Sequence, residues 1–224
     1  MSDTYEISRV IRSKQEARIA YDRISRWYDL LEGFWEKRIR ESGLRKLEIR
    51  EGYKVLEIGF ATGDSILTMA SKVGESGKVY GVDISPRMME ITQTRVSEAG
   101  LAPRVELICQ DALQLPFADD SLNGIFMSFT LELFDTPEIP LVLEECHRVL
   151  CPGGRICVVS LSKSGGREMM VKMYEWFHSH FPGVVDCRPI YARQAMKKSG
   201  FMIQEFEQTS IFGLPVEIDL ACKK

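Results

Sequence analysis

The segment VLEIGFATGD, at positions 55–64, constrains this chain more than any other part of its sequence. An apolar run there leads into a glycine-containing turn, which is the pattern of a buried strand that passes through a tight turn into a helix. Glycine lets such a turn adopt positive φ angles and lets a ligand approach the main-chain amides closely. We therefore predict that a nucleotide-like ligand binds where this strand ends.

The glycine spacing in this loop differs from that of a dinucleotide-binding loop, which follows the pattern G-x-G-x-x-G and holds a pyrophosphate at the helix N-terminus. After Gly59, the second glycine position is taken by Ala61 and the third by Asp64. Because a carboxylate at the third position would repel a pyrophosphate and attract a cation, we predict a positively charged nucleoside rather than NAD or FAD. A nicotinamide oxidoreductase is disfavoured for the same reason.

A second carboxylate follows about twenty residues after the glycine loop, at the spacing of a βαβ unit that binds a nucleoside. Asp83 ends the short apolar stretch KVYGVD at positions 78–83. An acid at this position typically accepts hydrogen bonds from the ribose hydroxyls. The alternative is that Asp83 caps the helix that opens at Ser85 and Pro86. The position at the end of a strand favours ribose binding.

Composition limits the kinds of partner and compartment that we expect. The 224 residues suit one α/β domain, and the formal net charge of −3 provides no basic surface for nucleic acid. No apolar run approaches the ~20 residues of a membrane-spanning helix, and the first residues do not resemble a secretion signal. The six cysteines contain no C-x-x-C pair, so we expect reduced thiols without a disulfide or a metal site. We predict a cytoplasmic protein.

Strand-like and helix-like segments alternate along most of the chain, which indicates a parallel sheet with helices on both faces. The predicted strands span residues 55–58, 79–82, 105–109, 124–129 and 155–161. Two further extended runs, 201–211 and 216–222, flank a turn at 212–215 and predict an antiparallel hairpin at the sheet edge. The predicted fold class is α/β: a Rossmann-like, doubly wound, mostly parallel seven-stranded sheet with an antiparallel C-terminal hairpin.

Four motifs, in the same order along the chain, resemble those of the class I S-adenosylmethionine-dependent methyltransferases. They are Glu57-Ile58-Gly59 with Gly63; Gly81-Val82-Asp83-Ile84-Ser85 followed by Met88 and Met89; Gln110-Asp111-Ala112 before Leu115-Pro116-Phe117; and Arg148-Val149-Leu150-Cys151-Pro152-Gly153-Gly154. Within that class the chain is most similar to the ubiquinone/menaquinone-type C-methyltransferases. It departs from their usual pattern at Ala61, Leu122-Asn123, Cys151 and Ser160.

The resemblance implies S-adenosyl-L-methionine as the cofactor and assigns roles around its methionine and ribose parts. Glu57 would anchor the methionine amino group through water. The backbones of Gly59, Ala61 and Gly63 would line the methionine and ribose, and Asp83 would hold the ribose hydroxyls.

Other matching positions would surround the adenine and the reacting methyl group. The resemblance places Met88 on one adenine face, with Ile84 nearby, and lets Asp111 accept from the exocyclic amine while the Ala112 amide donates to a ring nitrogen. Ser128 would touch the methionine end near the methyl group. Two alternatives stay open. Met88 could be plain core, because methionine fills gaps freely, and Asp111 could only start a turn.

The resemblance also implies four parts within a single domain of residues 1–224. Residues 1–47 would form an N-terminal helical cap, and residues 48–163 the cofactor-binding core. Residues 164–188 would form a lid over the acceptor, and residues 189–224 the last helix and the terminal hairpin.

Methyl transfer from a sulfonium mainly requires that the two reactants be aligned and desolvated. A phenol or amine acceptor can also need a base, for which we consider His178 and His180 in the lid and Tyr21 in the cap. The two histidines could instead be partly exposed helix residues. Glu132 could face the acceptor or water, and we expect His147 to be structural.

Methionine and aromatic side chains gather in the predicted lid and favour an apolar acceptor, because small-molecule pockets are lined in this way. They are Met169, Met170, Met173, Trp176, Phe177 and Phe181. The same residues could instead be lid core or a contact in a homodimer. We predict methyl transfer to the carbon or oxygen of a small, apolar or aromatic, quinone-like molecule. The alternatives are an amine or phospholipid N-methyltransferase, and a non-catalytic module that binds the cofactor or S-adenosyl-L-homocysteine.

Overall fold

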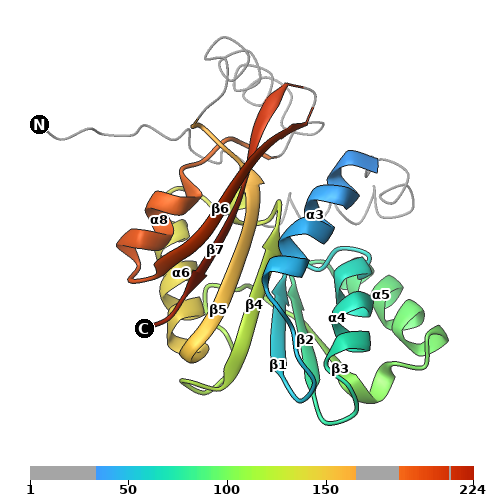
Figure 1. Cartoon of the computed structure of the whole chain (residues 1–224). Coiled ribbons are helices and arrows are strands. Elements are labelled where there is room, and N and C mark those ends of the chain that lie inside the picture. The colour runs from blue at the N-terminus through green and yellow to red at the C-terminus, as the bar shows by residue number, and fades with distance from the viewer. Residues whose placement is uncertain (1–33, 165–186, 212) are drawn as a thin grey trace, which may run out of the picture.

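The computed structural model describes residues 34–164, 187–211 and 213–224, and Figure 1 draws the elements within them. The strands are β1 (Lys54–Ile58), β2 (Lys78–Asp83), β3 (Val105–Cys109), β4 (Leu122–Ser128), β5 (Leu150–Leu161), β6 (Met202–Ile211) and β7 (Leu214–Cys222). The helices are α3 (Phe34–Lys46), α4 (Asp64–Lys72), α5 (Pro86–Glu98), α6 (Glu138–Val149) and α8 (Ala192–Lys198). Two 3-10 turns, η1 (Ala102–Arg104) and η2 (Leu131–Leu133), complete the described elements.

All seven of these strands belong to one sheet, in the order β3-β2-β1-β4-β5-β7-β6. Strands β1 to β5 are parallel to one another, and β7 runs antiparallel to both β5 and β6. The order reverses between β1 and β4, and ligands of open α/β sheets bind beyond the carboxyl ends of the strands at such a point. The predicted fold class is confirmed, including the antiparallel hairpin.

Each face of the sheet carries its own hydrophobic core, because the central strands are apolar on both sides. One core joins the sheet to α3, α4 and α5, with Ile66 and Met69 of α4 fully buried. The other joins it to α6 and α8, with Val142 and Leu143 of α6 fully buried. Figure 1 shows the two groups of helices on opposite sides of the strands. Helices on both faces were predicted from the alternating pattern and are confirmed.

Strand β5 is longer than the predicted strand 155–161, because the residues before it also join the sheet. The Pro152-Gly153-Gly154 segment lies within β5, and its backbone pairs with the end of the chain. The Gly153 N–H donates to the Lys223 carbonyl over 2.9 Å, and the Lys223 N–H donates to the Gly154 carbonyl over 2.9 Å. This partner is far away along the chain, so local turn chemistry could not reveal it.

The terminal hairpin also turns more tightly than expected. Strand β7 begins at Leu214, inside the predicted turn, and Gly213 takes a φ of 84° next to it.

Strand β7 contains two acidic residues, Glu217 and Asp219, that are almost completely buried. Arg193 of α8 pairs with both, at 2.6 Å from Glu217 and 3.6 Å from Asp219. A single arginine therefore fastens α8 to the sheet.

Several expectations can be compared with the described part of the chain only in part. All six cysteines are free thiols. Within residues 34–164, 187–211 and 213–224, no helix is both long enough and apolar enough to cross a lipid bilayer. Most of the predicted helical cap and lid lies outside these ranges, so the division into four parts stays a prediction.

Candidate functional site

The loop that joins β1 to α4 lies at the point where the strand order reverses, and three of its residues have positive φ angles. These are 75° at Gly59, 45° at Ala61 and 88° at Gly63. A left-handed conformation is uncommon for a residue that is not glycine. Ala61 therefore keeps the backbone shape of a glycine loop at the position where the sequence lacks the glycine.

Close packing explains why Gly59 and Gly63 carry no side chain. A β-carbon on Gly63 would lie 2.4 Å from Cγ2 of Thr92 in α5, and one on Gly59 would lie 2.4 Å from Oγ1 of Thr130. The Thr92 hydroxyl also donates to the Ala61 carbonyl over 2.9 Å. The loop is thus fitted between α5 and the segment after β4. Its own amides are hydrogen-bonded within the protein: the Gly59 N–H donates to the Val82 carbonyl and the Gly63 N–H to the Phe60 carbonyl, each over 2.8 Å.

Asp83 joins this loop to the loop that follows β2. Its Oδ2 accepts from the Ala61 N–H at 3.2 Å, and its Oδ1 accepts from the Ser85 N–H at 2.9 Å. The helix cap is Ser85, whose hydroxyl accepts from the Met88 N–H at 3.1 Å, with Pro86 in the first turn. The alternative reading of Asp83 as the cap of α5 is therefore wrong, and its carboxylate lies at the carboxyl end of the sheet as predicted.

The negative charge of Asp64 is compensated within the protein, contrary to the prediction that it would attract a cationic ligand. Its carboxylate pairs with two arginines: Oδ2 is 2.8 Å from Nη2 of Arg40, and Oδ1 is 2.5 Å from Nη2 of Arg95. Partial burial alone would raise the pKa of Asp64, but the two guanidinium groups hold it below its usual value. Asp64 therefore gives no ground for excluding a pyrophosphate, and the prediction of a ribose site depends on Asp83, which is half-buried.

Glu57 lies in β1 beneath the glycine loop, and only 3% of its surface is exposed. Its Oε2 has no hydrogen-bond partner within the residues that the structure describes. Burial raises the pKa of Glu57 to about 8, although the nearby Arg40 charge acts in the opposite direction. A buried carboxyl group with an unsatisfied oxygen costs stability unless something compensates it, which is what a cationic ligand would do.

Asp111 and Ala112 follow β3 and lie beside the end of β2. The Gln110 N–H donates to the Asp83 carbonyl over 3.0 Å, so this loop begins next to the ribose candidate. Asp111 accepts from the Leu113 N–H at 3.1 Å, which confirms that it starts a turn. That contact involves Oδ1 and is compatible with a second role for the carboxylate. Ala112 is buried.

The remaining predicted cofactor residues differ in how accessible they are. Met88 is 1% exposed and belongs to the core around α5, so the structure favours its core alternative. Ile84 is half-buried, next to Asp83. Ser128 is the half-buried last residue of β4, and its carbonyl accepts from the Thr130 hydroxyl at 3.0 Å.

The candidate bases His178, His180 and Tyr21 lie outside the described residues, as do the methionines and aromatic residues of the predicted lid. Glu132 can be placed: it is fully buried, and its Oε1 accepts from the Leu161 N–H at 3.1 Å. The expectation that it could face water is therefore wrong. His147 packs edge-on against Phe201, with 5.2 Å between the ring centroids, in agreement with a structural role.

Four residues that no sequence motif marks hold the site in shape: Arg40, Thr92, Arg95 and Thr130. Arg95 also donates to the Thr62 carbonyl over 2.7 Å. These residues come from three different elements, and no short motif links them to the loop. In the parts of the chain that the structure covers, no group of three or more histidine, cysteine or acidic residues could hold a metal ion. The arrangement suits a nucleoside with free hydroxyls.

Comparison with known proteins gives one clear family. The chain matches the model of the ubiE/COQ5 methyltransferase family over residues 12–187. A demethylmenaquinone methyltransferase from Symbiobacterium thermophilum is 31% identical over 187 residues, which cover 81% of this chain and 73% of that relative.

Two solved structures share the fold. The 4+2 cyclase SpnF superposes with a TM-score of 0.74 at 18% identity, covering 96% of this chain and 97% of its own. A SAM-dependent methyltransferase from Aquifex aeolicus gives a TM-score of 0.59 at 21% identity, covering 82% of this chain and 89% of its own. Because a cyclase and a methyltransferase share the architecture, these two similarities show the fold alone.

A substitution at Gly63 tests whether the loop needs its glycine for close packing as well as for backbone shape. We expect Gly63→Ala to lower the free energy of unfolding by about 3 kcal/mol, because it combines left-handed strain with a methyl group pressed against Thr92. The measurement is chemical denaturation followed by circular dichroism.

Gly100→Ala is the matched control, because Gly100 has a φ of 68° and nothing lies within 4 Å of an added β-carbon. Backbone strain alone should cost about 1 kcal/mol there. Equal losses for the two variants would show that the contact with Thr92 does not restrict the loop.

Proposed function

Because the chain belongs to the ubiE/COQ5 methyltransferase family, we propose that it transfers a methyl group from S-adenosylmethionine to a quinone-like acceptor. The observation that carries the proposal is the family match over residues 12–187, which includes the whole segment from β1 to β5. Membership of this methyltransferase family, together with the resemblance of its motifs to those of the S-adenosylmethionine-dependent enzymes, supports S-adenosylmethionine as the cofactor. The named substrate of the Symbiobacterium relative supports an aromatic, apolar acceptor of the naphthoquinone type.

The residues of the candidate site fit this cofactor. The loop at residues 59–63 has positive φ angles at Gly59, Ala61 and Gly63, and its packing against Thr92 and Thr130 fixes this shape at the end of β1. The Asp83 carboxylate stands at the end of β2, where an acid can accept hydrogen bonds from two ribose hydroxyls. Buried Glu57 has an oxygen atom without a partner within the described ranges, and the cofactor carries an ammonium group that needs a nearby acid.

We assign roles to the described residues accordingly. Glu57 anchors the methionine amino group, the backbones of Gly59, Ala61 and Gly63 line the ligand, and Asp83 holds the ribose. Asp111 and Ala112 recognise the edge of the adenine, since their loop begins with a hydrogen bond to the end of β2. Ser128 contacts the methionine end, because it closes β4 next to β1. Ile84 packs against the nucleoside. Met88 does not touch the nucleoside and supports the site from within the core.

When bound, S-adenosylmethionine supplies a methyl group on a positively charged sulfur, which reacts by in-line displacement. The chain must then bind the acceptor in line, exclude water and, for a phenolic acceptor, hold a base within hydrogen-bond reach. His178, His180 and Tyr21 stay the candidates for that base. We further propose that residues 1–47 and 164–188 act as cap and lid, and that the protein works in a reducing, cytoplasmic compartment.

Two departures from the usual quinone-enzyme pattern are explained by local structure and do not oppose the proposal. Ala61 adopts the left-handed conformation of the glycine that it replaces. Asn123 accepts from the Lys54 N–H at 2.8 Å, and its amide nitrogen lies 3.8 Å from Sγ of Cys151. Both contacts lie at the start of the strands, at the opposite end of the sheet from the candidate site. Nothing in the structure explains the serine at position 160.

Methyl transfer to a reduced quinone is the direct test. The purified protein is incubated with S-adenosylmethionine carrying a trideuterated methyl group and with a demethylated naphthoquinol that has a short isoprenoid chain. We expect one labelled methyl group on a ring carbon, with an equal amount of S-adenosylhomocysteine, as measured by mass spectrometry. The oxidised quinone is the control and should accept no label, because its ring carbon is not nucleophilic.

Other outcomes identify the competing functions. Label transferred to ethanolamine phospholipid or another amine, but not to the quinol, would replace the proposal with an N-methyltransferase. Tight binding of S-adenosylhomocysteine without transfer to any acceptor would indicate a non-catalytic binding module.

The raised pKa of Glu57 predicts that cofactor binding releases a proton. Its pKa of about 8 means that Glu57 is mainly protonated at pH 7 in the free protein, whereas an ammonium ligand stabilises the ionised form. Affinity for S-adenosylhomocysteine should therefore rise with pH up to about 8 and then level off. At pH 7, we expect the release of most of one proton per ligand, measured by calorimetry in two buffers with different ionisation enthalpies.

Glu57→Gln is the control for this experiment, because the ligand's own amino group also titrates near this pH. The ratio of wild-type to variant affinity isolates the contribution of Glu57 and should increase with pH. A constant ratio between pH 6 and pH 8.5 would remove Glu57 from the ligand site.

A further inference from the structure

The loop between β3 and β4, residues 110–121, carries Asp111 and Ala112 but contains no helix or strand. Its shape must therefore come from side-chain and long-range contacts. Two short-range contacts organise its first half. Asp111 accepts from the Leu113 N–H, and the Gln110 side-chain amide donates to the Gln114 carbonyl over 2.5 Å. The next residue, Leu115, is buried and marks where the loop meets α6.

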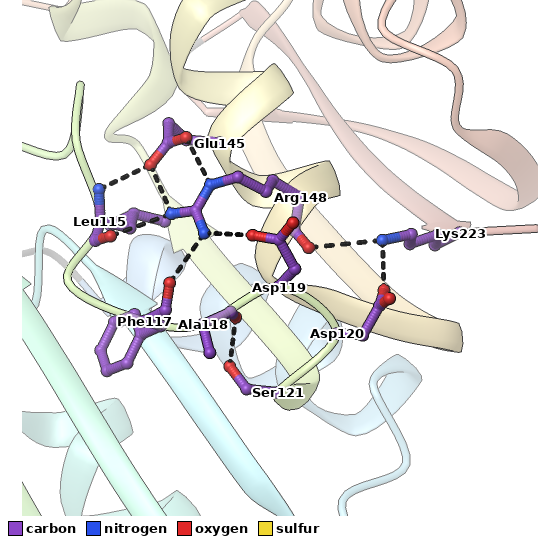
Figure 2. Close-up of polar contacts among 9 residues, drawn as sticks. All are labelled: Leu115, Phe117, Ala118, Asp119, Asp120, Ser121, Glu145, Arg148 and Lys223. Atoms are coloured by element: carbon purple, nitrogen blue, oxygen red, sulfur yellow. Dashed lines mark hydrogen bonds and ion pairs between the residues drawn. The ribbon is translucent and has the colours of Figure 1, made fainter.

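A single arginine at the end of α6 holds the second half of this loop. The guanidinium of Arg148 has five N–H groups, and the structure shows five hydrogen bonds from it (Figure 2). Two go to the Glu145 carboxylate, one to each of the carbonyls of Leu115 and Phe117, and one to the Asp119 carboxylate, over distances of 2.7–3.0 Å. Every donor of the side chain is used.

Glu145 completes the arrangement one turn earlier on the same helix. Its Oε2 accepts from the Leu115 N–H at 2.8 Å and also from Nη2 of Arg148 at 2.8 Å. The hydrogen bond with Arg148 lowers the pKa of Glu145 below its usual value, so the carboxylate stays ionised at neutral pH. Both backbone groups of Leu115 are thus held by this pair, as they would be in a strand.

Leu115 lies close enough to Asp111 along the chain for this grip to matter. The residues between them are bonded to one another, so a shift of Leu115 would displace the turn that presents Asp111. Phe117 adds an apolar anchor, because its ring packs edge-on against Tyr80 of β2 with 4.9 Å between the centroids. The loop is therefore fixed to α6 and to Tyr80, which packs on the hydrophobic core between the sheet and α6.

We propose that Arg148, held by Glu145, is a positioning residue that fixes the loop through which the protein selects adenine over other purines. This inference rests on the proposed roles of Asp111 and Ala112. Lysine could not replace Arg148, because a lysine has three donors and lacks the planar fork that reaches Leu115, Phe117 and Glu145 together. Arg148 touches neither the cofactor nor the acceptor in this account.

A second ion pair on the same loop provides a matched control. Lys223 lies 2.6 Å from the Asp120 carboxylate and 3.4 Å from the Arg148 carbonyl (Figure 2). It contacts neither Leu115 nor Phe117 through any described hydrogen bond. Asp120 has a φ of 55°, a conformation that asparagine also tolerates, so Asp120→Asn removes the charge of this pair without straining the loop.

The experiment compares the binding of S-adenosylhomocysteine with that of S-inosylhomocysteine, in which a carbonyl oxygen replaces the amine of adenine. Calorimetry on the wild-type protein should give an adenine preference of about 30-fold, the size expected for one charge-assisted hydrogen bond. Arg148→Lys should weaken S-adenosylhomocysteine about tenfold and reduce the preference to about threefold. Asp120→Asn should leave both values unchanged.

Glu145→Gln is the second variant, which serves if Arg148→Lys does not fold. It keeps one acceptor for Arg148 but loses the second carboxylate oxygen, which holds the Leu115 N–H. Its adenine preference should therefore fall between that of the wild-type protein and that of Arg148→Lys. A purely structural role would lower the melting temperature and leave the preference intact.

Each outcome has a distinct meaning. An unchanged adenine preference in folded Arg148→Lys or Glu145→Gln would overturn this inference and leave the proposed function standing. Equal wild-type affinity for the two ligands would overturn it by removing the role of Asp111. No binding of either ligand to the wild-type protein would instead refute the proposed function.

Discussion

The hydrogen bonds from two backbone amides to one carboxylate organise the whole candidate site. Asp83 accepts from Ala61 on one side and from Ser85 on the other, so the loops after β1 and β2 share one acid. The chain can make this contact only because parallel strands bring their carboxyl ends to the same edge of the sheet.

Arginines on the surrounding helices keep these loops in place. Arg40 of α3 and Arg95 of α5 share Asp64 at the start of α4, and Arg148 of α6 holds the loop after β3. Arginine suits this task because its planar fork bonds several oxygens at once and stays charged. These ion pairs are partly exposed and therefore add little to the stability of the fold. Their main effect is to fix the geometry of the loops.

The sheet could be predicted because its information is local: buried parallel strands are apolar runs, and turns interrupt them. Asp83 was placed correctly for the same reason, since it ends such a run. The predictions that failed concern residues whose partners are distant along the chain. The Pro-Gly-Gly segment at 152–154 pairs with Lys223. The charge of Asp64 is compensated by Arg40, 24 residues before it, and by Arg95, 31 residues after it. Spacing and composition carry no record of such contacts.

The central claim is that Asp83 holds the ribose of a bound nucleoside, and calorimetry with S-adenosylhomocysteine on the wild-type protein and the Asp83→Ala variant tests it most directly. The account predicts at least about tenfold weaker binding, because two charge-assisted hydrogen bonds to the ligand are lost. Circular dichroism must show that the variant is folded. Equal affinity of the two proteins for S-adenosylhomocysteine would contradict the account.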